Sequence, residues 1–480
     1  MVQVLLNIVS FLNIFFILIV VFFDKKKPES TLAWVLILFF IPYVGIFLYI
    51  VFGEFFRFSI RRKERDKVLN DEVLHAAINN QINYIENNSE LRKHYKWADL
   101  ILMNSKNARS IVSFDNNIEV FSRATDKYDS LFKDIKGAEE SIHISYYIIR
   151  KDFYGKQLLN LLVDKVKEGV EVRLIFDHIG SKITSKRFFK PLIKAGGKVE
   201  KFFPSRIFLK LYINHRNHRK MVIIDGKIGY LGGMNIGKEY IGSDKKITPW
   251  CDKHIRIEGT GVVSLQTQFF LDYLFVSKER IEWDNPNVIS KYYKIKQNVG
   301  NKLVQIVASG PDYKESNIRD SYLKMINSAK ERIIIETPYL IPDESIMTSL
   351  KLAASSGVKI QIIIPGVPDK RSVYFATLSY AKELMKYGVE IFAYNGFMHS
   401  KLMIVDDSIV NIGSANMDRR SFNLNFEINA IVYDEEFTKK NIEIIEKEIR
   451  DSALLNNKKK KVNIFVEVLE KLARLFAPII

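Results

Sequence analysis

Two segments of this chain carry the same polar residues at the same spacing, and these residue types can perform phosphoryl chemistry. Each segment has a histidine, one intervening residue, a lysine, four residues and an aspartate: His218, Lys220 and Asp225, then His399, Lys401 and Asp406. Every residue lies 181 positions from its counterpart. A single histidine is usually solvated or packed in a core, but that interpretation leaves the duplication unexplained. The repeat therefore identifies both histidines as candidate catalytic residues.

The residue types within and after these segments suit the cleavage of a phosphodiester. Imidazole can act as a nucleophile or as an acid near neutral pH. The two lysines can compensate the phosphoryl charge, and the amides of Asn235 and Asn416, which follow in glycine-containing turns, can donate to its oxygens. No cluster of carboxylates suggests a divalent metal, and Cys251 is the only cysteine. We expect chemistry without a metal or another cofactor.

The spacing predicts how a fold presents these groups. Residues two apart on a strand point to the same face, so each histidine and its lysine face one site together. The intervening Arg219 and Ser400 then point away. We therefore expect one bilobal active site, with one half from each copy.

The elements around the motifs predict an α/β fold built from a duplicated unit. Strand-like apolar runs alternate with helix-length segments, which favours largely parallel strands; the clearest runs are residues 141–149, 170–176, 221–224, 332–335, 359–364 and 402–405. Smaller echoes, such as Gly169-Val170 and Gly357-Val358, recur at similar separations. We predict two similar lobes, at residues 108–290 and 300–457.

The N-terminal segment is apolar enough to suggest a membrane hairpin. Residues 1–23 and 31–52 contain no charged side chain, and each run could cross a hydrocarbon core of ~30 Å as a helix. The sequence lacks the pattern of a cleaved signal peptide. We predict two transmembrane helices within residues 1–56 and a helical basic linker at residues 57–107. A buried soluble hairpin is the alternative.

Charge gives further expectations about partners and location. The chain has 72 Lys and Arg against 55 Asp and Glu, a net charge of +17, which implies an anionic partner. Basic residues directly after the hairpin outnumber the three lysines in its turn, which favours a cytoplasmic body. Residues 458–480 begin with a run of four lysines, which apolar residues at helical spacing follow. This pattern suits an anionic membrane surface; docking of that helix on the body is the alternative.

The duplicated motif resembles that of the phospholipase D superfamily, and further segments resemble its bacterial cardiolipin synthases. These segments are residues 30–34, Trp250–His254, Glu336–Asp343 and Gly413–Glu427. The resemblance extends from the apolar hairpin to the final helix. Cys251 is a departure, because many members have an arginine there, but this leaves the chemistry intact.

The resemblance implies a multi-pass enzyme of the bacterial cell membrane that makes cardiolipin. One histidine attacks phosphatidylglycerol and glycerol leaves. The hydroxyl of a second phosphatidylglycerol then attacks the phosphatidyl-histidine, with the other histidine as base. The resemblance assigns His218 as nucleophile and His399 as acid/base, although the symmetry of the motifs leaves the reverse assignment open.

The same resemblance assigns supporting residues. Asp252 and Glu427 resemble the carboxylates that orient the two histidines, and such a partner fixes the tautomer and stabilises imidazolium. Asp225 and Asp406 resemble residues that are structural in this family. Lys220, Lys401, Asn235 and Asn416 would bind the phosphate.

Three other functions compete with this interpretation. A phospholipase D-type hydrolase, or a transferase that uses another alcohol, would carry the same motifs, because transfer depends on excluding water. A nuclease would explain the basic charge, but the apolar hairpin argues against a nucleic-acid partner. A catalytically silent lipid-binding scaffold would not need both motifs intact. The sequence does not indicate an oligomeric state.

Overall fold

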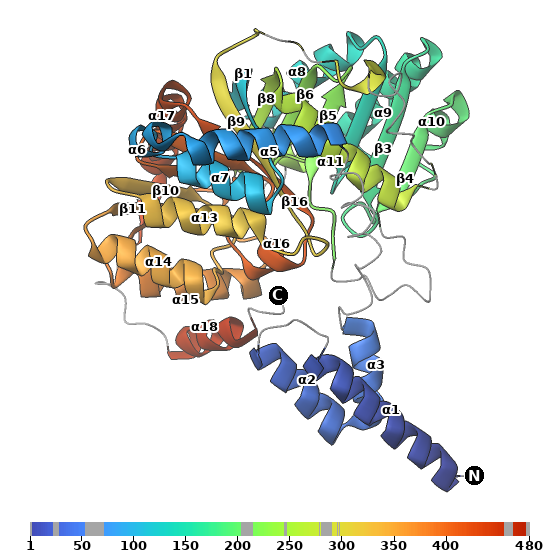
Figure 1. The fold of residues 1–480 in the computed structure, drawn as a ribbon, viewed down its shortest axis with the longest axis vertical. Helices are drawn as coiled ribbons and strands as arrows, with labels where there is room; N and C mark the ends of the chain where they lie inside the picture. Colours follow the sequence, from blue (N-terminus) through green and yellow to red (C-terminus); the bar gives the residue numbers. More distant parts are fainter. Residues whose placement is uncertain are drawn as a thin grey trace. The chain divides into compact units, whose positions relative to one another are not determined.

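The computed structural model describes residues 2–22, 28–52, 72–202, 215–243, 247–277, 279, 290–294, 296, 298–455 and 464–476. The chain divides into two compact units (Figure 1): residues 1–67 with 203–215, and residues 68–202 with 216–480. We call the second unit the body. It contains both histidine motifs.

The described residues of the first unit contain three helices where the sequence predicted two. These are α1 (Val2–Phe22), α2 (Pro28–Phe40) and α3 (Pro42–Phe52), which pack around Val20, Leu38 and Tyr49. The second predicted helix is interrupted at residue 41, because Pro42 lacks the N–H of a helix interior and its ring clashes with the preceding turn. Within the described residues, no helix is both long and apolar enough to cross a membrane. The predicted transmembrane hairpin is therefore not confirmed.

The body is built on a continuous sheet of 15 strands that spans both lobes. Lobe 1 contributes β1 (Val112–Phe121), β2 (Ser141–Tyr146), β3 (Glu171–Asp177), β4 (Lys198–Phe202), β5 (Lys220–Ile224), β6 (Ile228–Gly232) and β8 (His254–Glu258). Lobe 2 contributes β9 (Lys302–Ser309), β10 (Arg332–Glu336), β11 (Lys359–Pro365), β12 (Glu390–Tyr394), β14 (Leu402–Val405), β15 (Ile409–Gly413), β16 (Glu427–Tyr433) and β17 (Ser452–Leu454).

The strand order displays the duplication. It runs β17-β12-β11-β10-β14-β15-β16-β9-β1-β8-β6-β5-β2-β3-β4, with β9 and β1 antiparallel at the centre. From this centre the corresponding strands of each lobe follow in the same order, and β17 adds an edge strand to lobe 2. The α/β fold and the two similar lobes are confirmed.

The prediction of largely parallel strands is wrong. Only β2-β3-β4 and β10-β11-β12 are parallel within the sheet. The strands that follow each histidine form tight hairpins, β5 with β6 and β14 with β15, and so pair antiparallel. Each hairpin has only a few residues between its strands, and this connection is too short for the crossover that a parallel pair needs.

Helices cover both faces of the sheet (Figure 1). In lobe 1 they are α8 (Ala124–Lys136), α9 (Phe153–Lys167), α10 (Lys190–Ala195), the short η2 (Lys238–Ile241) and α11 (Gly261–Val276). In lobe 2 they are α13 (Asn317–Ser328), α14 (Glu344–Ser355), α15 (Arg371–Met385), α16 (Arg419–Asn423), α17 (Glu435–Arg450) and α18 (Ile464–Phe476).

The predicted linker is largely helical in its described part, residues 72–107, and its residues 57–71 lie outside the described residues. It forms α5 (Glu72–Asn87), α6 (Ser89–His94) and α7 (Ala98–Asn107). Trp97 and Ile101 are buried in the core of lobe 2, and the Asn104 amide donates to Gln305 Oε1 of β9 at 3.1 Å. These helices therefore belong to the body. They complete the packing of lobe 2.

Candidate active site

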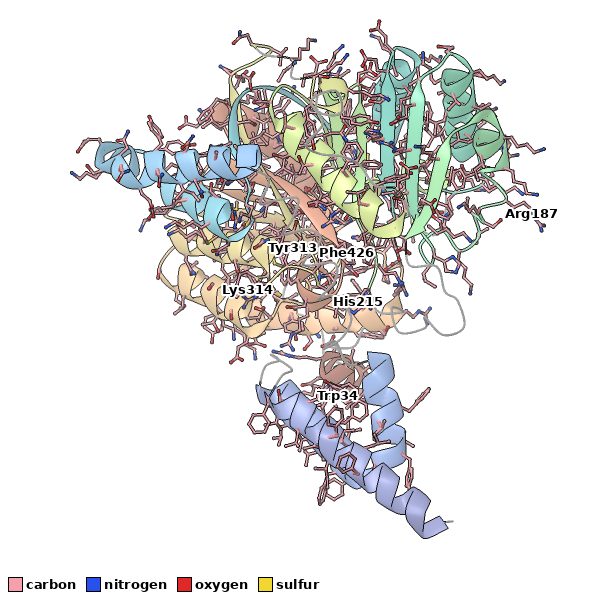
Figure 2. The ribbon with its side chains drawn as sticks, turned by 45° about the vertical axis from the view of Figure 1, so that its right-hand side comes forward. Trp34, Arg187, His215, Tyr313, Lys314 and Phe426 are labelled. Atoms are coloured by element: carbon pink, nitrogen blue, oxygen red, sulfur yellow. The ribbon has the colours of Figure 1, made fainter. Side chains whose placement is uncertain are left out.

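Each histidine lies on an extended segment that is hydrogen-bonded to the opposite lobe. The amide of His218 donates to the carbonyl of Phe426 at 2.9 Å, and the amide of Phe426 donates to the carbonyl of Arg216 at 2.8 Å. Figure 2 labels Phe426 in the middle of the body. On the other side, the His399 amide donates to the Cys251 carbonyl at 2.7 Å. There β13 (Phe397–Met398) pairs with β7 (Trp250–Cys251).

The side chains of the histidines also pair across the lobes. Nδ1 of His218, in lobe 1, lies 3.0 Å from both carboxylate oxygens of Glu427 in lobe 2. Nδ1 of His399, in lobe 2, lies 2.6 Å from Asp252 Oδ2 in lobe 1. Both carboxylate side chains are fully buried. A carboxylate on Nδ1 fixes the tautomer and leaves Nε2 as the reactive nitrogen.

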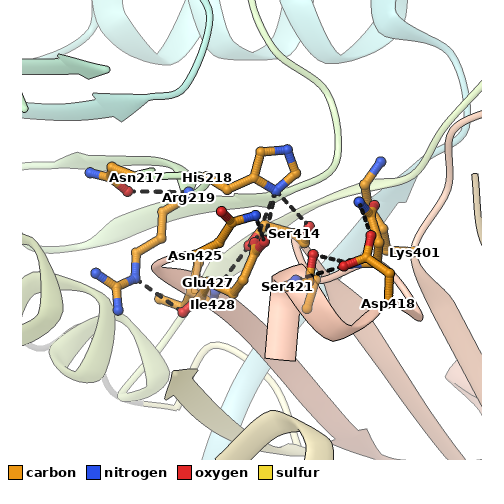
Figure 3. A network of polar contacts seen from close by, with 12 residues as sticks. Asn217, His218, Arg219, Lys401, Ser414, Asp418, Ser421, Asn425, Glu427 and Ile428 are labelled. Atoms are coloured by element: carbon orange, nitrogen blue, oxygen red, sulfur yellow. Dashed lines mark hydrogen bonds and ion pairs between the residues drawn. The ribbon is translucent and has the colours of Figure 1, made fainter. Parts of the chain in front are cut away.

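Polar neighbours hold Glu427 in this position (Figure 3). The Ser414 hydroxyl donates to Glu427 Oε2 at 2.5 Å, and the Asn425 amide donates to Oε1 at 3.2 Å. The counterpart of Ser414 in the other motif is Gly233, where an added Cβ would lie 2.0 Å from Asp252 Oδ1. The longer glutamate therefore leaves room for a serine, whereas the shorter aspartate requires a glycine beside it.

The two motifs share one electrostatic environment. Burial, together with the charges of both lysines, lowers the pKa of His218 to about 4 and that of His399 to about 3. Burial also lowers the pKa of Lys401 to about 8 and the pKa of Lys220 well below its usual value. The charge of Lys401 lowers the pKa of His218, and the charge of Lys220 lowers the pKa of His399. The four groups therefore lie close together.

The two carboxylates are anionic beside neutral histidines. Burial alone would raise the pKa of Asp252, but the charge of Lys401 and the hydrogen bond with His399 lower it. Burial likewise opposes the effect of His218 on the pKa of Glu427, which is lowered overall. A neutral imidazole is ready to act as a nucleophile. The negative charge of a bound phosphodiester would offset the lysines and raise the histidine pKa values, which allows one histidine to carry a proton.

The amides of the two predicted phosphate-binding asparagines have partners within the protein. Asn235 accepts from the Ile148 amide at 3.0 Å and donates to the Tyr240 hydroxyl at 2.9 Å. Asn416 donates to Asp418 Oδ2 at 3.1 Å. An amide group has two N–H donors, and these contacts use one of them in each residue. The second donor is the one that a phosphate contact would need.

The motif aspartates lie at the opposite end of the strands from the histidines. Asp225 accepts from the backbone amides of residues 139, 140 and 141 at 2.8–2.9 Å. Asp406 accepts from residues 330, 331 and 332 at 2.7–2.9 Å. Both have a positive φ, of 52° and 47°. Each aspartate therefore fastens a hairpin turn to the start of the neighbouring strand, β2 or β10.

Aromatic rings that the sequence analysis did not assign enclose the histidines. The ring of Tyr147 meets that of His218 edge-on, with centroids 4.9 Å apart. Trp250 and Phe397 lie 4.8 and 5.6 Å from His399. Phe397 precedes His399 by two residues, so strand periodicity could have identified it. No local pattern connects Tyr147 or Trp250 with a histidine so distant in sequence.

The arrangement supports nucleophilic displacement at phosphorus by a histidine. In the described part of the chain, no group of three or more His, Cys, Asp or Glu side chains could hold a metal ion. The site instead supplies two imidazoles, each oriented by a carboxylate, and two lysines that can receive phosphoryl oxygens. Such a site can split a phosphodiester exchange into two displacements through a covalent intermediate.

Comparisons with known proteins agree with this geometry. A family model described as "Cardiolipin synthase, PLD-like domain" matches residues 131–253 and 322–449, and a "Phospholipase_D-nuclease N-terminal" model matches residues 11–54. A cardiolipin synthase of Oceanobacillus iheyensis is 41% identical, over 100% of this chain and 99% of its own. The major cardiolipin synthase of Bacillus subtilis is 40% identical over the same shares.

A solved structure supports the fold at greater evolutionary distance. The phosphatidylserine synthase of Haemophilus influenzae matches with a TM-score of 0.59 at 15% sequence identity. The match covers 78% of this chain and 97% of that one. At this identity the likeness concerns the fold alone.

Proposed function

This chain belongs to the bacterial cardiolipin synthases of the phospholipase D superfamily, and on that premise we propose how its paired histidines act. It is a phosphatidyltransferase whose donor and acceptor are both phosphatidylglycerol. The products are cardiolipin and glycerol. The observation that carries this proposal is the crossed pairing of His218 with Glu427 and of His399 with Asp252.

The first displacement forms a phosphatidyl-histidine. Nε2 of His218 attacks the phosphorus of one phosphatidylglycerol, and the bond between phosphorus and the headgroup glycerol breaks. His399, protonated in the substrate complex, gives its proton to the departing glycerol oxygen. Lys220 and Lys401 hold the non-bridging oxygens, where negative charge accumulates in the transition state.

The second displacement reverses these roles. His399, now neutral, takes the proton from the headgroup hydroxyl of a second phosphatidylglycerol. The resulting oxygen attacks phosphorus, the bond to His218 breaks, and cardiolipin is released. The assignment of His399 as the proton carrier follows the family resemblance, and Asp252, 2.6 Å from its Nδ1, can stabilise the imidazolium.

Transfer in place of hydrolysis requires that water be kept from the covalent intermediate. The histidine side chains are only 12% and 13% exposed, and Tyr147, Trp250 and Phe397 pack on their rings. This enclosure favours an alcohol delivered by a lipid over free water. We also place the N-terminal helices in the bacterial cell membrane on the basis of their uncharged sequence, and the body in the cytoplasm on the basis of the basic residues that follow them.

Mass spectrometry of lipids tests the proposal. The purified full chain is incubated with phosphatidylglycerol vesicles beside His218→Ala and His399→Ala variants. Cardiolipin and free glycerol from the unmodified chain alone would support the transfer reaction. Phosphatidic acid without cardiolipin would identify a hydrolase, and an unchanged lipid pool would refute phosphatidylglycerol as the donor.

A further inference from the structure

The C-terminal helix α18 packs on the body through its charged side. Glu470 is 4% exposed, and its carboxylate receives Lys382 Nζ of α15 at 2.6 and 2.7 Å. Arg474 pairs with Glu383 Oε2 of α15 at 2.5 Å, and its guanidinium lies 4.4 Å from the ring centroid of Tyr380. These contacts confirm the alternative in which the helix docks on the body.

The apolar side of the same helix faces outward. Val468 and Leu472 are each 47% exposed and Leu475 is 70% exposed. Positions i, i+4 and i+7 form one stripe along a helix, and in a globular protein such a stripe normally faces the core. Here the orientation is inverted, because the ion pairs with α15 occupy the inner side. An exposed apolar stripe marks a surface for interaction.

Charge beside the stripe indicates the chemistry of its partner. Lys471, on α18 itself, has a 75% exposed side chain that pairs with Glu467 Oε1 at 3.2 Å, and the sequence places four consecutive lysines at 458–461 just before the helix, which give this end of the chain its positive charge. Apolar side chains that follow a lysine run in the sequence match the boundary between acyl chains and anionic headgroups.

The helix beneath α18 leads toward the catalytic residues. Asp369, just before α15, accepts from the Tyr339 hydroxyl at 2.6 Å, and the Thr377 hydroxyl of α15 accepts from the Leu340 amide at 3.2 Å. Asp369 is close enough to Lys401 to affect its pKa, which burial lowers and Asp369 raises. Helix α15, with Asp369 just before it, therefore connects α18 to the residues around Lys401.

We propose that α18 couples the body to an anionic lipid bilayer. Its charged side is fixed to α15 by Glu470 and Arg474, while Val468, Leu472 and Leu475 insert at the headgroup boundary. The helix would thereby hold the catalytic body against the surface that supplies its lipids. The inference rests on the proposed function only in the choice of phosphatidylglycerol as the anionic lipid.

A fluorescent probe on α18 tests the contact without requiring turnover. Leu475→Cys carries an environment-sensitive nitrobenzoxadiazole label, and Lys471→Cys on the same helix is the matched control. Native Cys251 is buried and hydrogen-bonded to Glu448, and the unsubstituted chain reports any labelling there. The full chain is reconstituted into phosphatidylcholine vesicles with or without phosphatidylglycerol.

The proposal predicts a blue shift of the label at 475, and quenching by brominated acyl chains, that grow with phosphatidylglycerol content. The label at 471 should respond less. A label at 475 that stays in water in both vesicles would overturn the proposal. The proposal would also be overturned if the label at 475 reported an apolar environment in detergent and was never quenched by brominated lipid. Another part of the chain would then cover the stripe.

A charge swap tests the coupling between helix and body. Lys382→Glu should lower the rate on phosphatidylglycerol vesicles but not in detergent micelles, and adding Glu470→Lys should restore the vesicle rate. An equal loss in vesicles and micelles, or no rescue by the swap, would contradict the coupling. If the unmodified chain made no cardiolipin, the probe experiment would still decide whether α18 contacts lipid.

Discussion

At the scale of single residues, each motif histidine pairs with a carboxylate from the other half of the duplicated sequence. Glu427 belongs to lobe 2 and Asp252 to lobe 1, yet they bind His218 and His399 respectively. Sequence analysis singled out all four residues but did not assign the pairs. Such pairing is a long-range contact between lobes, and spacing along the chain cannot encode it.

The carboxylates should matter through the tautomer that they impose. Glu427→Gln and Asp252→Asn place an amide beside Nδ1, which admits the wrong tautomer and removes the charge that stabilises imidazolium. We expect kcat to fall by about 10³- to 10⁴-fold in each variant, measured as glycerol released from phosphatidylglycerol. Ser414→Ala, which removes one hydrogen bond to Glu427, is the control and should cost about tenfold. Near-normal turnover in Glu427→Gln would refute the role.

The roles of the two histidines can be separated with a donor whose leaving group needs no proton. With phosphatidyl-p-nitrophenol, His399→Ala should still release about one equivalent of nitrophenolate per site, because His218 remains as nucleophile. His218→Ala should release none. Rapid-mixing absorbance measures the burst. The opposite pattern would exchange the two roles, and a missing burst in both variants would contradict the covalent route.

The depressed histidine pKa values predict how stability depends on pH. Buried His218 stays neutral down to about pH 4, whereas an unfolded histidine binds a proton below about 6.5. Between these values the unfolded chain binds more protons, so acidification lowers the free energy of unfolding. From pH 7 to pH 5 this amounts to about 2 kcal/mol per histidine.

Removing one histidine should therefore flatten this dependence. Between pH 7 and pH 5, the free energy of unfolding should fall by about 2 kcal/mol less in His218→Gln than in the unmodified chain. Urea unfolding of the detergent-solubilised full chain measures the difference. Unfolded Asp and Glu titrate near 3.9 and 4.3, so the lowered pKa values of Asp252 and Glu427 act mainly below this window. Equal slopes for both proteins would show that His218 is not held neutral.

At the scale of elements, the periodicity of apolar residues located the strands. The direction in which the strands pair, and the break in the N-terminal helix, depend instead on short turns and on a proline. The run at 402–405 is β14 as predicted, and residues 221–224 lie within β5. The antiparallel hairpins follow from the short connections at Asp225 and Asp406. These connections are visible in the sequence, but the prediction of parallel strands did not take them into account. The break between α2 and α3 follows from Pro42, because a proline interrupts a helix interior.

The turn after β6 should tolerate no side chain. A Cβ at Gly233 would lie 2.0 Å from Asp252 Oδ1, so Gly233→Ala must displace the carboxylate that holds His399. We expect a loss of about 1–3 kcal/mol in stability and a large loss of kcat, measured by denaturant unfolding and glycerol release. Gly137→Ala is the matched control, because its nearest neighbour would be 3.6 Å away. Unchanged turnover in Gly233→Ala would contradict the packing argument.

At the scale of the whole molecule, the shared sheet and the crossed pairs make the two lobes one catalytic unit. β1 and β9 pair at the centre of the sheet, and neither lobe contains both members of a histidine–carboxylate pair. The sequence predicted a bilobal site from the duplication. It did not predict that helices α5 and α7 complete lobe 2, because α7 packs on α13, which is distant along the chain.

If one chain builds a whole site, inactive variants should not rescue each other. His218→Ala and His399→Ala each disable a different half of the same site. Co-reconstituted in phosphatidylglycerol vesicles, they should show no more cardiolipin synthesis than the sum of the separate variants. Recovery of activity would require a site assembled from the lobes of two chains, by exchange of lobes between copies. That outcome would contradict the intrachain pairing of Phe426 with His218, because a recovered site needs lobe 1 of one chain to meet lobe 2 of another.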